Sequence, residues 1–135
     1  MKTGLAFVVC AISLLGLDFA WLGLTTETLY RPAMGTLLRT SFDLAPGAGF
    51  YVIYALALSV LIVRPALTQR WSHGELTWKA GLLGLAAFAT YDLTALAVIR
   101  DWPLGLSLID MAWGTFAAVA ACNVTALILR ALKQA

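Results

Sequence analysis

The sequence predicts an all-α protein, a four-helix transmembrane bundle with antiparallel helices. Of the 135 residues, 61% are hydrophobic and 12% are charged, whereas soluble domains carry about 45–50% apolar and about 25% charged residues. A transmembrane helix needs about 20 mostly apolar residues to cross about 30 Å of hydrocarbon. Four runs of this kind occur, at Gly4–Leu24, Ala48–Val63, Ala80–Ile99 and Leu104–Leu129. They occupy most of the chain, so we expect one integral membrane domain over residues 1–135.

The first run follows Lys2, as the apolar part of a secretory signal follows a basic residue. No small-x-small cleavage site comes after it, so we interpret it as a retained helix. Beyond it, Glu27 and Arg31 are four residues apart, a spacing that favours an ion pair on one face of a helix. This spacing predicts a further helical turn above the membrane, followed by a short interfacial segment.

The later connections are short. Arg64-Pro65 is expected to end the second span, since proline cannot continue the backbone hydrogen-bond ladder. Arg100–Pro103 leaves so few residues between the third and fourth runs that these two helices must be antiparallel neighbours. Four spans place both termini on the same side of the membrane.

The basic residues lie near the ends of the spans, where they act as topology signals. The side of the termini carries Lys2, Arg64, Arg70, Lys79, Arg130 and Lys133, and the other side carries Arg31, Arg39 and Arg100. This bias predicts that both termini are cytoplasmic. The net charge of +2 is then a consequence of topology, and we expect the lipid bilayer, not nucleic acid, as the partner.

Three aspartates interrupt the apolar runs at a similar depth. At a rise of 1.5 Å per residue, Asp18 lies about 21 Å and Asp92 about 18 Å from the inner boundary of the hydrocarbon. Asp110 lies about 9 Å from the outer boundary of a core about 30 Å thick. A carboxylate that faces lipid costs on the order of 3 kcal/mol or more, so all three are expected to face the interior of the bundle.

Small residues share helix faces with two of these aspartates. In the fourth run the stripe is Asp110, Gly114, Ala117, Ala118 and Ala121, and in the third it is Gly81, Gly84, Phe88 and Asp92. Small side chains let a neighbouring helix approach closely. Trp21 and Trp113 each follow an aspartate by three residues, which puts them on the same helix face as that aspartate.

These positions predict a small polar cavity with aromatic walls, open toward the outer side. The expected ligand-binding residues are Asp18, Trp21, Tyr54, Tyr91, Asp92, Thr94, Asp110 and Trp113. Three carboxylates at one depth would repel one another, so either at least one is protonated near neutral pH or a cation lies among them. The alternative is structural, because a membrane aspartate can also hold helices together by a hydrogen bond to a threonine or tyrosine.

Other chemistry has little support in the sequence. The lone His73 has no companion ligands for haem or zinc, and no lysine lies inside a span to form a Schiff base. Cys10 and Cys122 fall in different apolar runs without CxxC spacing, which is typical of small buried residues. Signatures of serine nucleophiles and phosphate-binding loops are missing as well. We therefore assign no catalytic residue, metal or cofactor, and the sequence leaves open whether the protein is an enzyme.

A series of short motifs runs along nearly the whole chain. In order they are DxxWLG with a later Tyr (Asp18, Trp21, Tyr30), FY (Phe50, Tyr51), YDLT (Tyr91–Thr94), WP (Trp102, Pro103) and DxxWG (Asp110, Trp113, Gly114). Together they resemble a bacterial family of small predicted membrane proteins known only as a domain of unknown function. The resemblance implies a four-helix, multi-pass protein of the bacterial inner membrane and supplies no activity.

Three functions are compatible with these observations. The first is a small proton- or cation-coupled transporter or carrier, alone or as a homodimer, that binds a cation or a cationic or amphipathic molecule beside the aspartates. The second is an accessory or assembly subunit that docks its small-residue stripes onto a larger membrane complex. The third is a membrane-embedded enzyme that modifies a lipid, with an aspartate pair as general acid and base.

Overall fold

The computed structural model describes residues 2–37 and 44–132. All regular elements in these two ranges are helical. They are, in chain order, α1 (Lys2–Thr25), the π-helix η1 (Thr26–Tyr30), α2 (Arg31–Met34), the 3-10 helix η2 (Gly35–Leu37), α3 (Leu44–Leu58), the π-helix η3 (Ser59–Val63), α4 (Arg64–Thr68), α5 (His73–Val98) and α6 (Leu104–Ala131).

These elements join into four helical segments long and apolar enough to cross a membrane. The segments are Thr3–Met34, Leu44–Thr68, His73–Val98 and Leu104–Ala131. Three of them contain a predicted apolar run entirely, and the third segment contains Ala80–Ile99 except for its last residue. Each extends beyond its run at one end or both, because helix formation continues into the polar flanks. The prediction of an all-α bundle of four candidate spans is confirmed.

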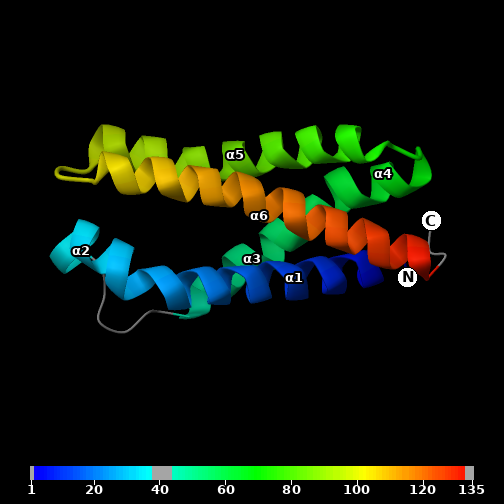
Figure 1. Cartoon of the computed structure of the whole chain (residues 1–135), viewed down its shortest axis with the longest axis horizontal. Coiled ribbons are helices and arrows are strands. Elements are labelled where there is room, and N and C mark those ends of the chain that lie inside the picture. Colours follow the sequence, from blue (N-terminus) through cyan, green and yellow to red (C-terminus); the bar gives the residue numbers. More distant parts are fainter. Residues whose placement is uncertain (1, 38–43, 133–135) are drawn as a thin grey trace.

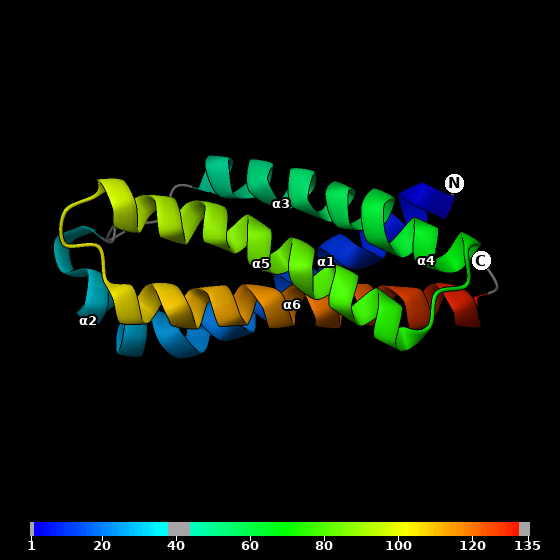
Figure 2. The same cartoon turned by 90° about the horizontal axis from the view of Figure 1, so that it is seen from above.

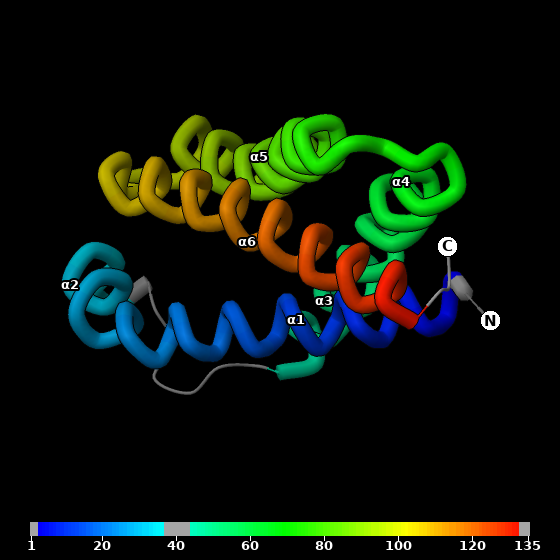
Figure 3. Tube along the Cα trace, turned by 45° about the vertical axis from the view of Figure 1, so that its right-hand side comes forward, coloured from blue at the N-terminus to red at the C-terminus, as the bar shows by residue number. Residues whose placement is uncertain are grey.

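The helices form an elongated bundle in which α6 lies between α5 and α1 (Figure 3). α5 packs along α6, and α1 packs on both α6 and α3. The start of α1 and the end of α6 lie at the same end of the bundle, and the α5–α6 connection lies at the opposite end (Figure 1). Viewed from above, α3 lies along the edge of the bundle opposite α6 (Figure 2).

The predicted small-residue stripes of α5 and α6 face each other. A Cβ atom added to Gly84 would lie 2.6 Å from the Cβ of Ala118 and 2.7 Å from the carbonyl oxygen of Gly114. A Cβ atom added to Gly114 would lie 2.2 Å from Cγ of Phe88. Glycine at these two positions therefore lets the backbones approach so closely that α5 and α6 form one tightly interlocked hairpin.

Residues 2–37 and 44–132 contain two π-helical turns, and each is followed directly by an Arg-Pro pair. In η1 the N–H of Arg31 donates to the carbonyl of Thr26, and in η3 the N–H of Arg64 donates to the carbonyl of Ser59. A proline ring collides with the carbonyl four residues earlier in a regular α-helix. A widened turn before the proline removes this collision, so the chain continues in helical form past Pro65 to Thr68. The expectation that Arg64-Pro65 ends the second span is wrong for this reason.

The turns above the first span are helical, as the Glu27–Arg31 spacing predicts. Nε of Arg31 lies 2.9 Å from Oε2 of Glu27, and the helix continues through α2 to Met34. The extra helical segment carries the chain to the end of the bundle where α5 and α6 are connected (Figure 1).

Polar and apolar groups are distributed as expected for a protein in lipid. Phe19 is 69% exposed and Val98 is 80% exposed, while Ser59 and Thr125 are fully buried. Each of these two hydroxyl groups donates to the backbone carbonyl four residues earlier, so no polar partner is needed from outside the helix. Apolar side chains outside and satisfied polar groups inside are the arrangement that a bilayer stabilises.

Candidate ligand-binding cavity

A cavity of about 450 Å³ lies in the half of the bundle away from the termini. Its walls come from α1, η1, α2, α3, α5 and α6 and from the connection before α6. The lining contains the three carboxylates Asp18, Asp92 and Asp110, the aromatic residues Trp21, Tyr30, Phe50, Tyr51, Phe88, Tyr91, Trp102 and Trp113, and the apolar residues Leu22, Met34, Ala87 and Leu106. This volume is within the range of small-molecule binding sites.

Asp18 is held by donors from two other helices. Its side chain is buried, the Tyr51 hydroxyl donates to Oδ2, and Nε1 of Trp113 donates to Oδ1 at 2.8 Å. Both carboxylate oxygens are therefore satisfied, although the group lies inside an apolar span. Asp18 links α1 to α3 and α6, which is the structural role that the sequence left open as an alternative.

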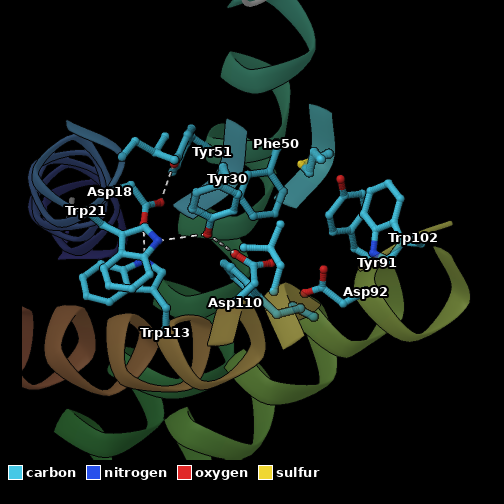
Figure 4. Close-up of a pocket in the computed structure, with 15 residues that line it drawn as sticks. Asp18, Trp21, Tyr30, Phe50, Tyr51, Tyr91, Asp92, Trp102, Asp110 and Trp113 are labelled. Atoms are coloured by element: carbon cyan, nitrogen blue, oxygen red, sulfur yellow. Dashed lines mark hydrogen bonds between the residues drawn. The ribbon is translucent and has the colours of Figure 1, made fainter. Parts of the chain in front are cut away.

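Tyr30 connects η1 to α6. Nε1 of Trp21 donates to its hydroxyl oxygen at 2.9 Å, and the hydroxyl donates to Oδ1 of Asp110 at 2.7 Å (Figure 4). In a regular α-helix the nine residues from Trp21 to Tyr30 make about two and a half turns, which would place the two side chains on opposite faces. The π-turn η1 takes up one extra residue and thereby rotates Tyr30 toward the cavity.

The two tryptophans join these hydrogen-bonded groups. The rings of Trp21 and Trp113 stack with their centroids 4.6 Å apart and their planes 7° apart. Trp21 donates toward Tyr30 and Trp113 toward Asp18, so the indoles have both a packing and a hydrogen-bonding role. The prediction that Trp21 and Trp113 flank the aspartates agrees with this arrangement.

Asp92 differs from the other two aspartates because one of its carboxyl oxygens is buried and has no hydrogen-bond partner among the described residues. The residue is 2% exposed, and its buried oxygen Oδ2 accepts no hydrogen bond within residues 2–37 and 44–132. Its carboxyl group points toward that of Asp110 and is close enough to share a hydrogen bond if one of the two carries a proton (Figure 4). Two ionised carboxylates that face each other in an apolar surrounding repel one another at a large cost in free energy.

The charge of the cavity is one-sided. Its described lining carries three carboxylates and no lysine, arginine or histidine. Within the described parts of the chain, no three side chains of His, Cys, Asp or Glu come together as ligands for one metal ion. Asp18 is separated from the Asp92–Asp110 pair by its own donors, so the three aspartates share a cavity without meeting at one point.

Six of the eight expected site residues line the cavity, and Tyr54 and Thr94 do not. Tyr54 is buried directly beneath it, stacked on Phe50 with centroids 5.1 Å apart, and its hydroxyl has no hydrogen-bond partner among the described residues. Thr94 is exposed on the outer face of α5, where its hydroxyl donates to the carbonyls of Thr90 and Tyr91. Because the hydroxyl bonds to carbonyls of its own helix, Thr94 can face lipid without leaving a polar group unsatisfied.

Sequence reasoning did not place Tyr30, Tyr51 or Trp102 in the site. Tyr51 and Tyr30 supply the donors to Asp18 and Asp110, and Trp102 packs edge-to-face on Tyr91 with centroids 5.6 Å apart. All three belong to the short motifs that carry the family resemblance. Membership in these motifs was the signal that could have identified the three residues. Helical periodicity alone misplaces Tyr30, and it gives no position for Trp102, which lies in a connection.

Comparison with known proteins places the chain in a family. Searches of curated proteins and of solved structures each found no match. The family described as "Predicted membrane protein (DUF2177)" matches residues 3–127, nearly the whole chain. The resemblance to a family of small predicted membrane proteins is therefore confirmed, and it agrees with the four apolar helices. We conclude that this chain is a member of the membrane protein family DUF2177.

Proposed function

We propose that this protein is a small membrane carrier that binds a cation or a cationic amphipathic molecule in the Asp92–Asp110 cavity and exchanges it for a proton. The observation that carries the proposal is the unpartnered oxygen of Asp92. A buried carboxylate oxygen without a donor is costly, so a site that leaves one open toward a cavity is suited to receive a donor or a positive charge.

The one-sided charge of the lining supports the same function. Since the described lining supplies no basic side chain, the negative charge of the aspartate pair is balanced by a proton when the site is empty and by a cation when it is filled. The two occupants compete for one pair of carboxyl groups. Competition of this kind is the basis of proton-coupled exchange.

The carrier is expected to be a single multi-pass domain of the bacterial inner membrane, with both termini in the cytoplasm. Arg64, Arg70, Lys79 and Arg130 belong to segments at the end of the bundle where α1 begins, and Arg31 and Arg100 belong to the opposite end. Arg39 and Lys133 lie outside the described residues. An excess of basic residues on one side favours the cytoplasmic location of that side, and reporter fusions to the C-terminus test it.

Proton release on ligand binding provides the first test. The purified protein in weakly buffered nanodiscs is titrated with the chlorides of Na⁺, K⁺, tetramethylammonium and benzyltrimethylammonium, while a pH indicator reports released protons. At least one cation is expected to release about one proton per protein. Asp92→Asn is expected to abolish release, because an amide has no exchangeable proton of this kind and carries no negative charge.

Asp101→Asn provides a matched control. Asp101 has a positive φ of 63° in the exposed connection before α6, a conformation that asparagine tolerates, and it does not line the cavity. This variant should release protons as the wild type does. If no cation releases protons from the folded wild type, the carrier proposal is wrong. The result would favour the alternative that this protein is an accessory subunit whose aspartates have a structural role.

A further inference from the structure

The cavity has an acidic end and an apolar end. Asp92 and Asp110 lie at the acidic end, beside the edge-to-face pair of Tyr91 and Trp102 (Figure 4). Most of the remaining wall is apolar and includes Phe88, which packs against Phe50 with ring centroids 6.5 Å apart. A ligand that fits both ends carries a positive charge on an apolar body.

The rim of the cavity lies within the membrane-spanning part of the bundle. Among the lining residues, Phe50 of α3 is 42% exposed and Tyr91 of α5 is 57% exposed. Phe50 lies six residues from the start of α3 and Tyr91 seven residues from the end of α5, which is about 10 Å inside either helix end. Exposed side chains at this depth face hydrocarbon, so this edge of the cavity adjoins the bilayer and not the water.

The packing of the helices agrees with an opening at this edge. α5 packs chiefly on α6, and α3 packs chiefly on α1, so the two helices that carry Phe50 and Tyr91 belong to different halves of the bundle. Aromatic side chains from the two halves meet across the rim through Phe50 and Phe88. Such rings can turn aside without loss of hydrogen bonds.

We propose that the ligand is an apolar organic monocation, a quaternary or protonated amine on an apolar body, which reaches the cavity sideways from the bilayer between α3 and α5. This inference rests on the carrier function proposed above. The ammonium group lies against Asp92 and Asp110 with Tyr91 and Trp102 beside it, and the apolar body occupies the end lined by Phe50 and Phe88. Aromatic faces stabilise ammonium groups that have lost their water.

A single charge on the ligand follows from the charge balance. The empty pair holds one proton and one negative charge, and the proton leaves to the aqueous phase when the ligand binds. One positive charge replaces another, so the net charge of the site is unchanged. The titratable groups that face the pair are Asp18 of α1, Tyr30 of η1, Tyr51 of α3 and Tyr91 of α5.

Inorganic cations do not fit this site. A hard metal ion needs several oxygen ligands around one point, and no group of three candidate ligand side chains exists among the described residues. The apolar lining also offers few groups to replace a hydration shell. An organic ammonium ion loses far less hydration, because its charge is spread over methyl groups.

The test compares four probes in nanodiscs that contain the wild type, Asp92→Asn or no protein. Benzyltrimethylammonium is compared with its uncharged carbon isostere neopentylbenzene, with tetramethylammonium, and with benzyldimethyldodecylammonium. Binding is measured by the change in tryptophan fluorescence after correction for uptake by empty nanodiscs. Benzyltrimethylammonium is expected to bind at least about tenfold more tightly than the isostere and than tetramethylammonium, and Asp92→Asn should remove this preference.

The dodecyl probe tests the route from the bilayer. If the site opens sideways, the long chain remains in lipid and the corrected affinity stays close to that of benzyltrimethylammonium. Loss of binding by the dodecyl probe alone would show that the cavity opens to water, and equal binding of the isostere would show that charge is not recognised. Proton release by Na⁺ or K⁺ without binding of organic cations would overturn this inference and leave the carrier function intact. Absence of both responses would overturn the two proposals together.

Discussion

The hydroxyl of Tyr30 lies 2.7 Å from Oδ1 of Asp110, although the two residues are 80 positions apart in the sequence. This hydrogen bond joins the extended end of the first span to the last helix, and it also takes up one oxygen of the aspartate that faces Asp92. The other side of the hydroxyl accepts from Trp21. Tyr30 therefore links the first helical segment to α6 at the cavity and occupies one of the two carboxyl oxygens of Asp110.

Tyr30→Phe is expected to lower the stability of the folded protein. The change leaves an oxygen of Asp110 and Nε1 of Trp21 without their partner, and each unsatisfied group costs about 1–3 kcal/mol. Thermal unfolding in detergent, followed by circular dichroism, measures the effect. Tyr91→Phe is the matched control, since the Tyr91 hydroxyl makes no hydrogen bond within the described residues, and an equal loss in both variants would contradict the assigned role.

Asp18→Asn and Asp92→Asn are expected to differ in their effects on stability. Asp18 accepts from both Tyr51 and Trp113, and an asparagine in its place can accept from only one of them. We expect a loss of about 1–3 kcal/mol and altered Trp113 fluorescence in this variant. Asp92→Asn should preserve the fold, because its amide can donate to Asp110. Similar unfolding temperatures for the two variants would show that Asp18 is not the structural member.

Gly84→Ala is expected to separate α5 from α6. The added methyl group would lie 2.6 Å from the Cβ of Ala118 and 2.7 Å from the backbone of Gly114, where no flexible side chain can give way. Overpacking of this kind costs about 1–3 kcal/mol. Gly16→Ala, at a helical position with nothing within 4 Å, should be neutral or slightly stabilising. The unfolding temperature should therefore fall for Gly84→Ala and stay the same or rise slightly for Gly16→Ala.

A deletion tests the role of the π-turn η1. Removing Leu29 converts the widened turn into an ordinary α-helical turn and keeps Tyr30 on the cavity side. The ring of Pro32 then meets the carbonyl four residues earlier, at a cost of about 3 kcal/mol, so the variant should fold with reduced stability. Removing Ile12, an exposed apolar residue in the regular part of α1, rotates one end of the helix by about 100° against the other and should prevent folding. Size-exclusion profiles and near-UV circular dichroism distinguish the two results.

Composition and helical periodicity predicted the spans, the antiparallel hairpin of α5 and α6, and the inward position of the aspartates. These features depend on the apolar surroundings of a membrane helix and on regular helical geometry. Both can be deduced from short stretches of the sequence. The small-residue stripes around Gly84 and Gly114 are of the same kind, because close helix packing needs small side chains at fixed spacing.

The difference in hydrogen bonding between the aspartates could not be predicted in this way. Asp18 and Asp92 lie at similar depths, and their difference arises from partners on other helices, Tyr51 and Trp113 for one and none for an oxygen of the other. The position of Tyr30 could not be predicted for a second reason. A π-turn changes the rotation of everything beyond it, so the rule of 100° per residue is not valid across η1. Tyr54 was expected in the site from its depth in the membrane, and depth alone does not say which side of a helix faces the cavity. Thr94 follows Asp92 by two residues, which turns it about 200° away from that aspartate.

The close contact of Gly84 with Gly114 has a mechanical consequence. It joins closely the two helices that carry Asp92 and Asp110, so we expect these two carboxyl groups to move together in any movement of the bundle. Tyr30, Tyr51 and Asp18 belong to the other half. In the carrier proposed above, exposure of the site to each side of the membrane in turn would require α1 and α3 to tilt against the α5–α6 hairpin. The hydrogen bonds from Tyr30 to Asp110 and from Trp113 to Asp18 would have to break during this movement.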